Sequence, residues 1–119
     1  MRLHGAMLFV KDLDRMTSFY AGVLGMKPNE DTRQENWVEF KESQFSLHAI
    51  PAGIAASIQV QSPPTPREQS AAKLTFEVRD VDATLKRIEA LGLPLLRRPW
   101  GGTEAVDPEG NVFALCATA

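Results

Sequence analysis

The sequence predicts an α+β fold made of two successive βαβββ modules, and the prediction rests on an internal repeat. The stretch VKDLD at Val10–Asp14 returns as VRDVD at Val78–Asp82. Phe45 in FSLHA and Phe113 in FALCA are separated by the same interval. Two matches at one offset, in the same order within each half, indicate a duplicated unit, and a repeat of this kind decides the architecture.

Each half begins with a short apolar strand, at residues 7–10 and 74–78, that leads into an amphipathic helix. Asp12 or Asp14 in the first half, and their counterparts Asp80 or Asp82 in the second, can accept hydrogen bonds from the free N–H groups of the helix start. A glycine then ends each helix. The apolar positions of the two helices have the spacing of a core-facing stripe. In the first helix they are Met16, Phe19, Tyr20, Val23 and Leu24, followed by Gly25; in the second they are Val81, Leu85, Ile88 and Leu91, followed by Gly92.

Short strands follow each helix. Residues 37–40 and 45–50 predict a hairpin in the first half, and residues 103–106 and 112–116 predict one around the turn Asp107–Asn111. Prolines at positions 63, 64 and 66 disfavour regular structure between the halves. We therefore expect one domain over residues 1–119, with modules at about 1–61 and 68–119 and a linker at about 62–67.

The composition favours a soluble globular protein of the cytoplasm and excludes several other classes. A hydrophobic content of 44% and a charged content of 24% are typical of a globular domain. The net charge of −2 argues against nucleic acid or an anionic membrane as a partner. Cys116 is the only cysteine, which excludes an intrachain disulfide and fits a reducing compartment. The apolar run at residues 6–10 is too short for a signal sequence or a membrane span.

Three stretches together are typical of one known family: VKDLD with Phe19-Tyr20 and Val23-Leu24-Gly25-Met26, then Pro99-Trp100-Gly101-Gly102, and Asp107-Pro108-Glu109-Gly110-Asn111. In these stretches the chain resembles the vicinal oxygen chelate superfamily, which holds glyoxalase I, bleomycin-resistance proteins, fosfomycin-resistance enzymes and extradiol dioxygenases. The likeness covers nearly the whole chain. It implies that the two modules form a cup-shaped mixed sheet with helices on the convex face, ligands on the concave face, and commonly a homodimer.

In the metalloenzymes of this superfamily, four side chains bind a divalent ion that acts as a Lewis acid, and suitable ligands are His, Gln or carboxylates. The resemblance places these positions five residues before the valine of each VxDxD stretch and just before the leucine of each closing strand. Here they are occupied by Gly5, Ser46, Lys73 and Ala114. Glycine and alanine supply no ligand atom and a protonated lysine repels a cation, so we expect no bound metal and no cofactor.

Side chains alternate across a strand, so the register divides each strand between the two faces of the sheet. The residues expected to face the helices are all apolar, whereas a shift by one would bury Lys73, Glu77 and His48 at high cost. Small-molecule sites combine apolar walls with a few polar groups. The residues that we expect to bind a ligand have this make-up: Phe9, Trp37, Glu39, Ser46, His48, Lys73, Thr75 and Glu77, with Trp100 at the rim.

Several of these residues have a simpler interpretation beside the functional one. Lys73 and Glu77 could pair with each other, and His48 could be a hydrogen-bonded histidine in a polar wall. Arg97 and Arg98 could meet an anionic ligand or only be solvated. Cys116 is expected on the inner face as a small buried hydrophobe without a catalytic role.

The preferred function is a small-molecule-binding protein without the usual metal site. The alternative is a lyase, isomerase or dioxygenase-type enzyme. It would use either a divalent metal in a new site, with His48 and Glu39 or Glu77 as ligands, or His48 as a metal-free catalytic general base. A third possibility is a structural or regulatory domain, which would be favoured if side chains of the chain itself filled the cup.

Overall fold

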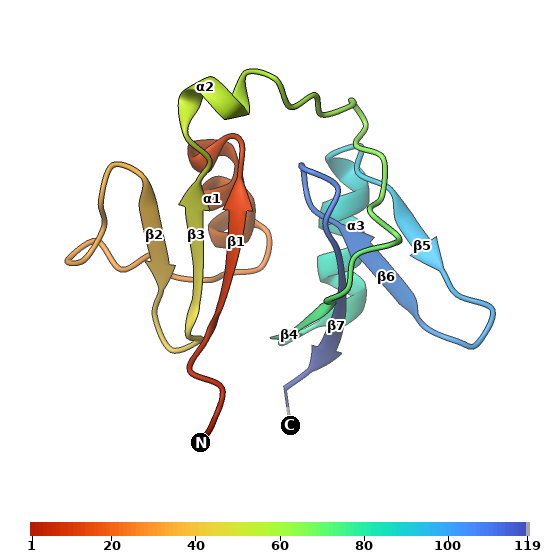
Figure 1. The fold of residues 1–119 in the computed structure, drawn as a ribbon. Helices are drawn as coiled ribbons and strands as arrows, with labels where there is room; N and C mark the ends of the chain where they lie inside the picture. The colour runs from red at the N-terminus through yellow and green to blue at the C-terminus, as the bar shows by residue number, and fades with distance from the viewer. Residues whose placement is uncertain (119) are drawn as a thin grey trace. The chain divides into compact units, whose positions relative to one another are not determined.

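The computed structural model describes residues 1–118 and divides the chain into two compact units, Met1–Gln59 and Val60–Ala119. The first unit contains a three-stranded sheet in the order β1-β3-β2, with β1 parallel and β2 antiparallel to β3 (Figure 1). Its elements are β1 (Ala6–Val10), α1 (Leu13–Gly22), β2 (Trp37–Phe40), β3 (Phe45–Ala49) and the short helix α2 (Ala52–Ala55).

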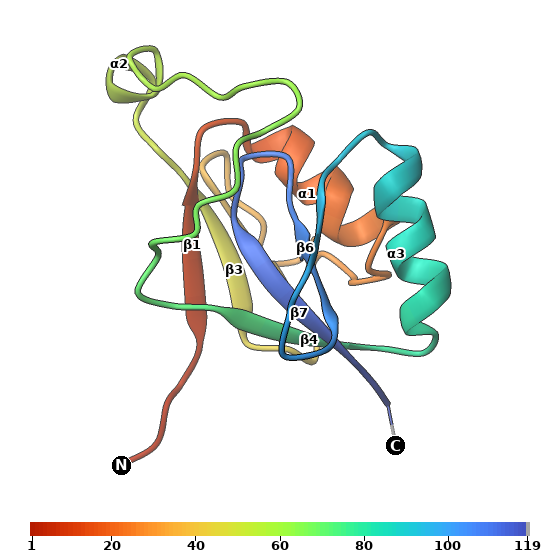
Figure 2. The ribbon, with the colours of Figure 1, turned by 90° about the vertical axis from the view of Figure 1, so that its right-hand side faces the viewer.

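The second unit repeats this plan with one more strand. Its sheet has the order β4-β7-β6-β5, and β4 is again parallel to the closing strand β7. Helix α3 runs along the side of this sheet (Figure 2) and contacts β5 and β7. The elements are β4 (Leu74–Val78), α3 (Val81–Ala90), β5 (Leu95–Arg97), β6 (Thr103–Val106) and β7 (Val112–Ala117).

The predicted repeat and the α+β fold of two modules are confirmed. The first strands and the long helices of the two halves begin and end at equivalent positions of the repeat. The structure also selects between the candidate caps: Asp12 accepts a hydrogen bond from the backbone N–H of Arg15 at 3.1 Å, and Asp80 accepts one from Ala83 at 3.0 Å. The repeat therefore extends from the strand order to the atoms that start each helix.

The first module departs from βαβββ because its fourth strand is reduced to an isolated bridge between Pro28 and Phe40. Proline has no N–H to donate to a strand ladder, and the polar residues 29–36 lack the alternation of a half-buried strand. Two further elements, α2 and β5, were not among the segments predicted individually. Strand β5 completes the second module, whereas α2 follows the closing strand of the first.

The alternation predicted for the strands holds in both units. Val10 and Leu47 are fully buried against α1, while Phe9 on the opposite face is 62% exposed. Aromatic rings fill the core of the first unit, where Tyr20 and Phe45 have ring centroids 5.1 Å apart. In the second unit Phe113 is buried, and its ring meets that of Phe76 edge to face.

The predicted linker is fastened to the second unit by the Asp107–Asn111 turn. The buried Asp107 carboxylate accepts hydrogen bonds from the backbone of Glu109 and Asn111 and from the Asn111 amide, at 2.9 to 3.0 Å. The backbone N–H of Arg67 then donates to the Gly110 carbonyl at 2.8 Å. Gly110 has a φ of 92°, and a Cβ there would lie 2.5 Å from the Thr65 carbonyl oxygen, so only glycine permits this close approach.

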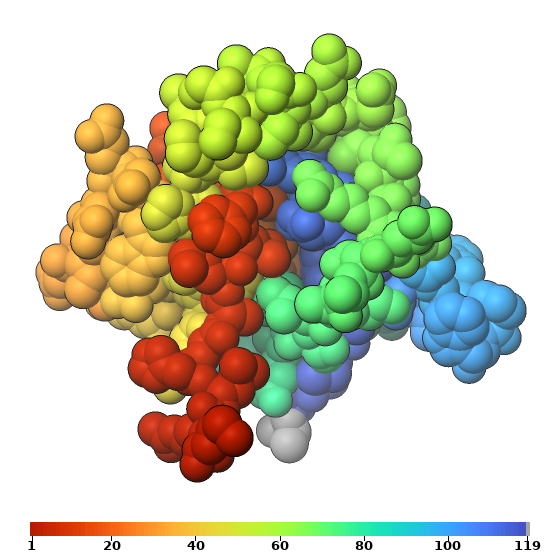
Figure 3. All heavy atoms as spheres, in the orientation of Figure 1, coloured from red at the N-terminus to blue at the C-terminus, as the bar shows by residue number. Residues whose placement is uncertain are grey.

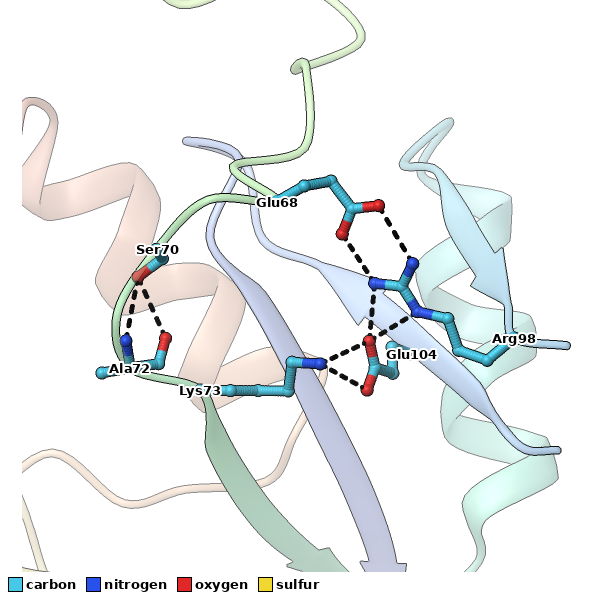
Figure 4. A network of polar contacts seen from close by, with 6 residues as sticks. All are labelled: Glu68, Ser70, Ala72, Lys73, Arg98 and Glu104. Carbon is cyan, nitrogen blue, oxygen red and sulfur yellow. Dashed lines mark hydrogen bonds and ion pairs between the residues drawn. The ribbon is translucent and has the colours of Figure 1, made fainter. Parts of the chain in front are cut away.

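Four charged side chains of the second unit form a network that we call the clasp: Glu68, Lys73, Arg98 and Glu104 (Figure 4). The Lys73 ammonium donates to both Glu104 oxygens, at 2.7 and 2.9 Å. Arg98 donates through Nε to Glu104 at 2.8 Å and through both terminal nitrogens to Glu68 at 2.7 and 2.9 Å. The clasp thus ties the segment before β4 to β6 and to the hairpin that β5 and β6 form.

The clasp lowers the pKa values of both of its carboxyl groups. Hydrogen bonds from Lys73 and Arg98 hold the pKa of Glu104 below its ordinary value of 4.5. The hydrogen bonds from Arg98 do the same for the pKa of Glu68, and both carboxylates raise the pKa of Arg98. A depressed folded-state pKa contributes stability that is present above the unfolded-state value and lost as the pH falls through the folded-state value.

No helix in residues 1–118 combines the length and the apolar character that crossing a membrane requires.

We predict that the clasp makes the protein acid-sensitive. Below a pH of about 4.5 the free energy of unfolding should fall more steeply in the wild type than in Glu104→Gln, because the variant lacks that titrating carboxyl group. At pH 7 Glu104→Gln should already be less stable, since Lys73 and Arg98 lose their shared anion. Urea denaturation between pH 3 and 7 measures both effects.

The matched control is Glu77→Gln, which removes a carboxylate of the same unit that makes no ion pair within the described residues. It should follow the wild-type acid profile. Equal profiles for Glu104→Gln and the wild type would contradict a stabilising clasp.

Candidate functional site

An aromatic row crosses the open face of the first sheet. Phe9 on β1 and Trp37 on β2 both pair in register with His48 on β3. The rings of Phe9 and His48 have centroids 5.4 Å apart and are tilted by 49°. Phe9 is largely exposed, whereas His48 and Trp37 are half-buried. Strand pairing therefore brings three of the predicted site residues side by side on one face.

A second row lies next to the aromatic row and is made of Met7, Ser46 and Glu39. The Glu39 carboxylate accepts a hydrogen bond from the Thr32 hydroxyl at 2.9 Å and a longer one from the Asn29 amide at 3.5 Å. It therefore holds the loop that precedes β2, and its charge is partly satisfied within the unit. Ser46 is half-buried between Met7 and Glu39.

The hydrogen bonding of His48 defines its chemistry. Nδ1 lies 2.8 Å from the carbonyl oxygen of Ala49. A carbonyl can only accept, so Nδ1 carries the proton, and Nε2 of the neutral ring is an acceptor. Within residues 1–118 Nε2 makes no hydrogen bond. His48 thus offers a basic nitrogen whose ring orientation is fixed by the backbone.

An open depression begins at His48 and continues past the ends of β1 and β3. Its volume is about 740 Å³. Helix α2 and the chain around it form one side, and in Figure 3 these residues make a bulky cap at this end of the unit. The lining combines apolar and polar groups: Ile50, Pro51, Ala52, Ala55 and Ala56 with Lys11, Gln34, Glu35, Asn36 and His48.

The predicted site residues of the second unit have different surroundings. Thr75 and Glu77 are exposed on β4, where they pair in register with Ala114 and Cys116. The suggested pairing of Lys73 with Glu77 is wrong, because the Lys73 ammonium binds Glu104 on β6. Glu104 of β6 lies on the same face as Lys73, and its carboxylate is within hydrogen-bonding distance of the Lys73 ammonium.

The structure also changes the expectations for Cys116 and for the arginines beside Trp100. Cys116 is exposed and not a buried hydrophobe, because it lies on the open face near the end of β7. Trp100 is 74% exposed, and the Arg98 guanidinium lies over its ring at 5.5 Å from the centroid. Arg98 is thus occupied by two carboxylates and one aromatic ring, whereas Arg97 is exposed.

The four positions at which the resemblance implies metal ligands do not fit a divalent ion. A side chain at Gly5 would place its Cβ 2.5 Å from the Gln44 carbonyl oxygen, so this backbone admits only glycine without a shift. Lys73 is a cation already bound to Glu104. Ala114 has no ligand atom, which leaves the Ser46 hydroxyl as the only uncharged donor. Among the described residues, no three His, Cys, Asp or Glu side chains are grouped closely enough to hold a metal ion.

Sequence reasoning placed the aromatic row correctly on one face but missed the partners that define its chemistry. The depression was not foreseen, since α2 and the loop at 34–36 have no signal of a binding wall. Glu104 could have been found, because the alternation of TEAV points its side chain away from the buried Ala105. Glu68 had no such signal, as it lies in an irregular segment.

Comparison with known proteins identifies the family. The family model described as "Glyoxalase/Bleomycin resistance protein/Dioxygenase superfamily" matches residues 2–115. A protein of unknown function from Agrobacterium tumefaciens str. C58 is 29% identical, with a TM-score of 0.67 over 100% of this chain and 95% of that one. A comparison with curated proteins gave no match.

Two further solved structures share the fold at lower identity. A glyoxalase/bleomycin resistance protein/dioxygenase family enzyme from Burkholderia phytofirmans PsJN is 19% identical, with a TM-score of 0.67 and 98% of each chain covered. The fosfomycin resistance protein FosX from Listeria monocytogenes is 19% identical, with a TM-score of 0.69 over 99% of this chain and 92% of that one. With its repeat, its fold and a family match over nearly its whole length, this chain belongs to the glyoxalase/bleomycin resistance protein/dioxygenase superfamily.

Proposed function

We propose that this chain is a small-molecule-binding protein that uses the open face of its first unit and works without a bound metal. The observation that carries the proposal is the aromatic row of Phe9, His48 and Trp37 beside the depression. Apolar and aromatic walls with a few oriented polar groups are the usual make-up of a small-molecule site. The third possibility, a structural domain, has less support because this face is not filled by side chains of its own unit.

The absence of metal chemistry is supported by the four family positions. A variant of the Listeria FosX has been solved with Mn(II) and 1S,2S-dihydroxypropylphosphonic acid. A phosphonate is an anion and requires cationic partners or a metal. In this chain Lys73 and Arg98 both hold carboxylates, so a phosphonate that bound at these two residues would have to displace Glu104 or Glu68. The cup-shaped sheet, the homodimer and the cytoplasmic location remain predictions from the sequence.

We predict that ligands of this protein bind at the aromatic row. In a fragment screen followed by ¹H–¹⁵N NMR, the responding signals should be the amides around His48 and the indole N–H of Trp37. Phe9→Ala should weaken binding by about fivefold, because it removes an aromatic contact worth about 1 kcal/mol. The control Leu91→Ala truncates a comparably exposed apolar side chain of the second unit and should leave affinity unchanged. Equal losses in both variants, or signals confined to the second unit, would contradict the assignment.

We predict that ligand binding does not depend on metal. Protein dialysed against EDTA should bind its ligand with unchanged affinity, and 1 mM Mn²⁺ should shift the midpoint of thermal unfolding by less than about 1 °C. A resident ion with a micromolar dissociation constant would stabilise the fold by about 4 kcal/mol at this concentration. One divalent ion per chain, removed by chelator together with binding, would overturn the proposal.

A second candidate function, a metal-free enzyme, is favoured by the tautomer of His48. With Nδ1–H fixed on the Ala49 carbonyl, Nε2 can accept a proton from a bound substrate. A divalent metal held by His48 and Glu39 has less support, because Glu39 is bound to Thr32.

If the chain turns over a substrate, His48→Ala should lower kcat by about 10²- to 10⁴-fold, the usual contribution of a general base. Substrate binding should largely survive, because Phe9 and Trp37 remain. Steady-state kinetics and binding by NMR separate the two quantities. A His48→Ala variant with wild-type kcat would rule out this role, and Leu91→Ala in the second unit is the control for a general loss of stability.

A further inference from the structure

We infer that the ligand taken at His48 is a planar, uncharged aromatic molecule that carries an O–H or N–H donor. The inference rests on the proposed function and narrows it to a chemical class. It follows from three properties of the site: the state of the histidine, the shape of the surrounding surface, and the charges at the depression.

His48 favours a ligand that carries a hydrogen-bond donor. Nδ1 of His48 is committed to the Ala49 carbonyl at 2.8 Å, so the nitrogen left for a ligand is the acceptor Nε2. A ligand without an O–H or N–H group would cover this nitrogen and remove its water without a replacement hydrogen bond. An acceptor that loses its partner in this way costs roughly 1 to 3 kcal/mol. The carboxylate of Glu35, in the same depression, adds a further acceptor, while the amide side chains of Gln34 and Asn36 can both donate and accept.

A planar aromatic shape fits the aromatic row. Phe9, His48 and Trp37 lie at paired positions of three adjacent strands, and the rings of Phe9 and His48 have centroids 5.4 Å apart. Phe9 exposes 62% of its surface, more than a ring buried in the core would. Flat ligands gain from offset or edge contacts with such rings beyond the area that they bury. The small side chains of Ala52, Ala55 and Ala56 leave the adjoining depression open.

An anion is disfavoured by the charges at the depression. Lys11 is the only cationic side chain of its lining, and its ammonium donates to the Ile58 carbonyl. Glu35 contributes a negative charge at the same depression. A carboxylate or phosphonate ligand would meet Glu35 and would have to compete for Lys11. The volume of about 740 Å³ admits a molecule of one to three fused rings.

Four probes test the class: indole, 1-methylindole, indole-3-carboxylate and cyclohexanol. Indole and 1-methylindole share one planar bicycle and differ in the N–H donor, the third probe adds a negative charge, and the fourth keeps a donor without a planar ring. Each is titrated into the intact ¹⁵N-labelled chain, and dissociation constants are read from the amides around His48. We expect indole to bind about fivefold more tightly than 1-methylindole, the effect of one hydrogen bond, and more tightly than the other two probes.

The variant His48→Phe keeps a ring in the row and removes the acceptor. It should bring the affinities of indole and 1-methylindole to within a factor of two, with 1-methylindole binding about as in the wild type. The variant Leu91→Ala, which truncates an exposed side chain of the second unit, should keep the wild-type preference and so controls for a general loss of stability.

The outcomes separate this inference from the proposed function. If indole-3-carboxylate or cyclohexanol binds this face more tightly than indole, or if His48→Phe keeps the indole preference, the ligand class is wrong while a binding face remains. If none of the four probes shifts the amides around His48 at millimolar concentration, both the class and the binding face are overturned.

Discussion

The parallel pairing of the first strand with the closing strand is the constraint on which each unit depends. Met7 lies opposite Ser46 and Phe9 opposite His48 in the first unit, as Thr75 lies opposite Ala114 in the second. A slip of one residue would turn every side chain of a strand to the other face. It would expose Leu47 and bury His48, so the hydrophobic effect fixes the register. The same register that buries the core therefore aligns the aromatic row.

The two units use this shared frame for different purposes. In the first, the row contains Phe9 and His48, and the equivalent positions of the repeat in the second contain Glu77 and Cys116. In the second, the polar side of the sheet is occupied by the clasp, whose charges balance one another. A duplicated scaffold has thus kept its core and diverged on its open faces. This is consistent with buried positions being set by packing and exposed ones by function.

The fold could be predicted from the sequence because its signals are local and repeated. Asp12 and Asp80 cap helices at the same place in each half, and the apolar stripes follow directly. The first module has only an isolated bridge where a fourth strand would lie, because Pro28 has no N–H to donate to a ladder. The predicted partner of Lys73 was wrong because its actual partner is distant in sequence. Glu104 is 31 residues away, and only the strand order brings the two together. The acceptor state of His48 depends on one backbone carbonyl, which no sequence pattern encodes.

Two of the four positions at which the family resemblance implies metal ligands are held by the packing of this chain. A histidine at position 5 would need the Gln44 carbonyl to move, yet that carbonyl accepts the Ala6 N–H at 3.0 Å and helps to start the β1–β3 ladder. Replacing Lys73 would leave Glu104 with Arg98 alone and would loosen the attachment of the segment before β4. Positions 5 and 73 therefore have structural roles that oppose a metal ligand there. Under the proposed function, binding falls instead to the rings and the oriented imidazole on the open face of the first unit.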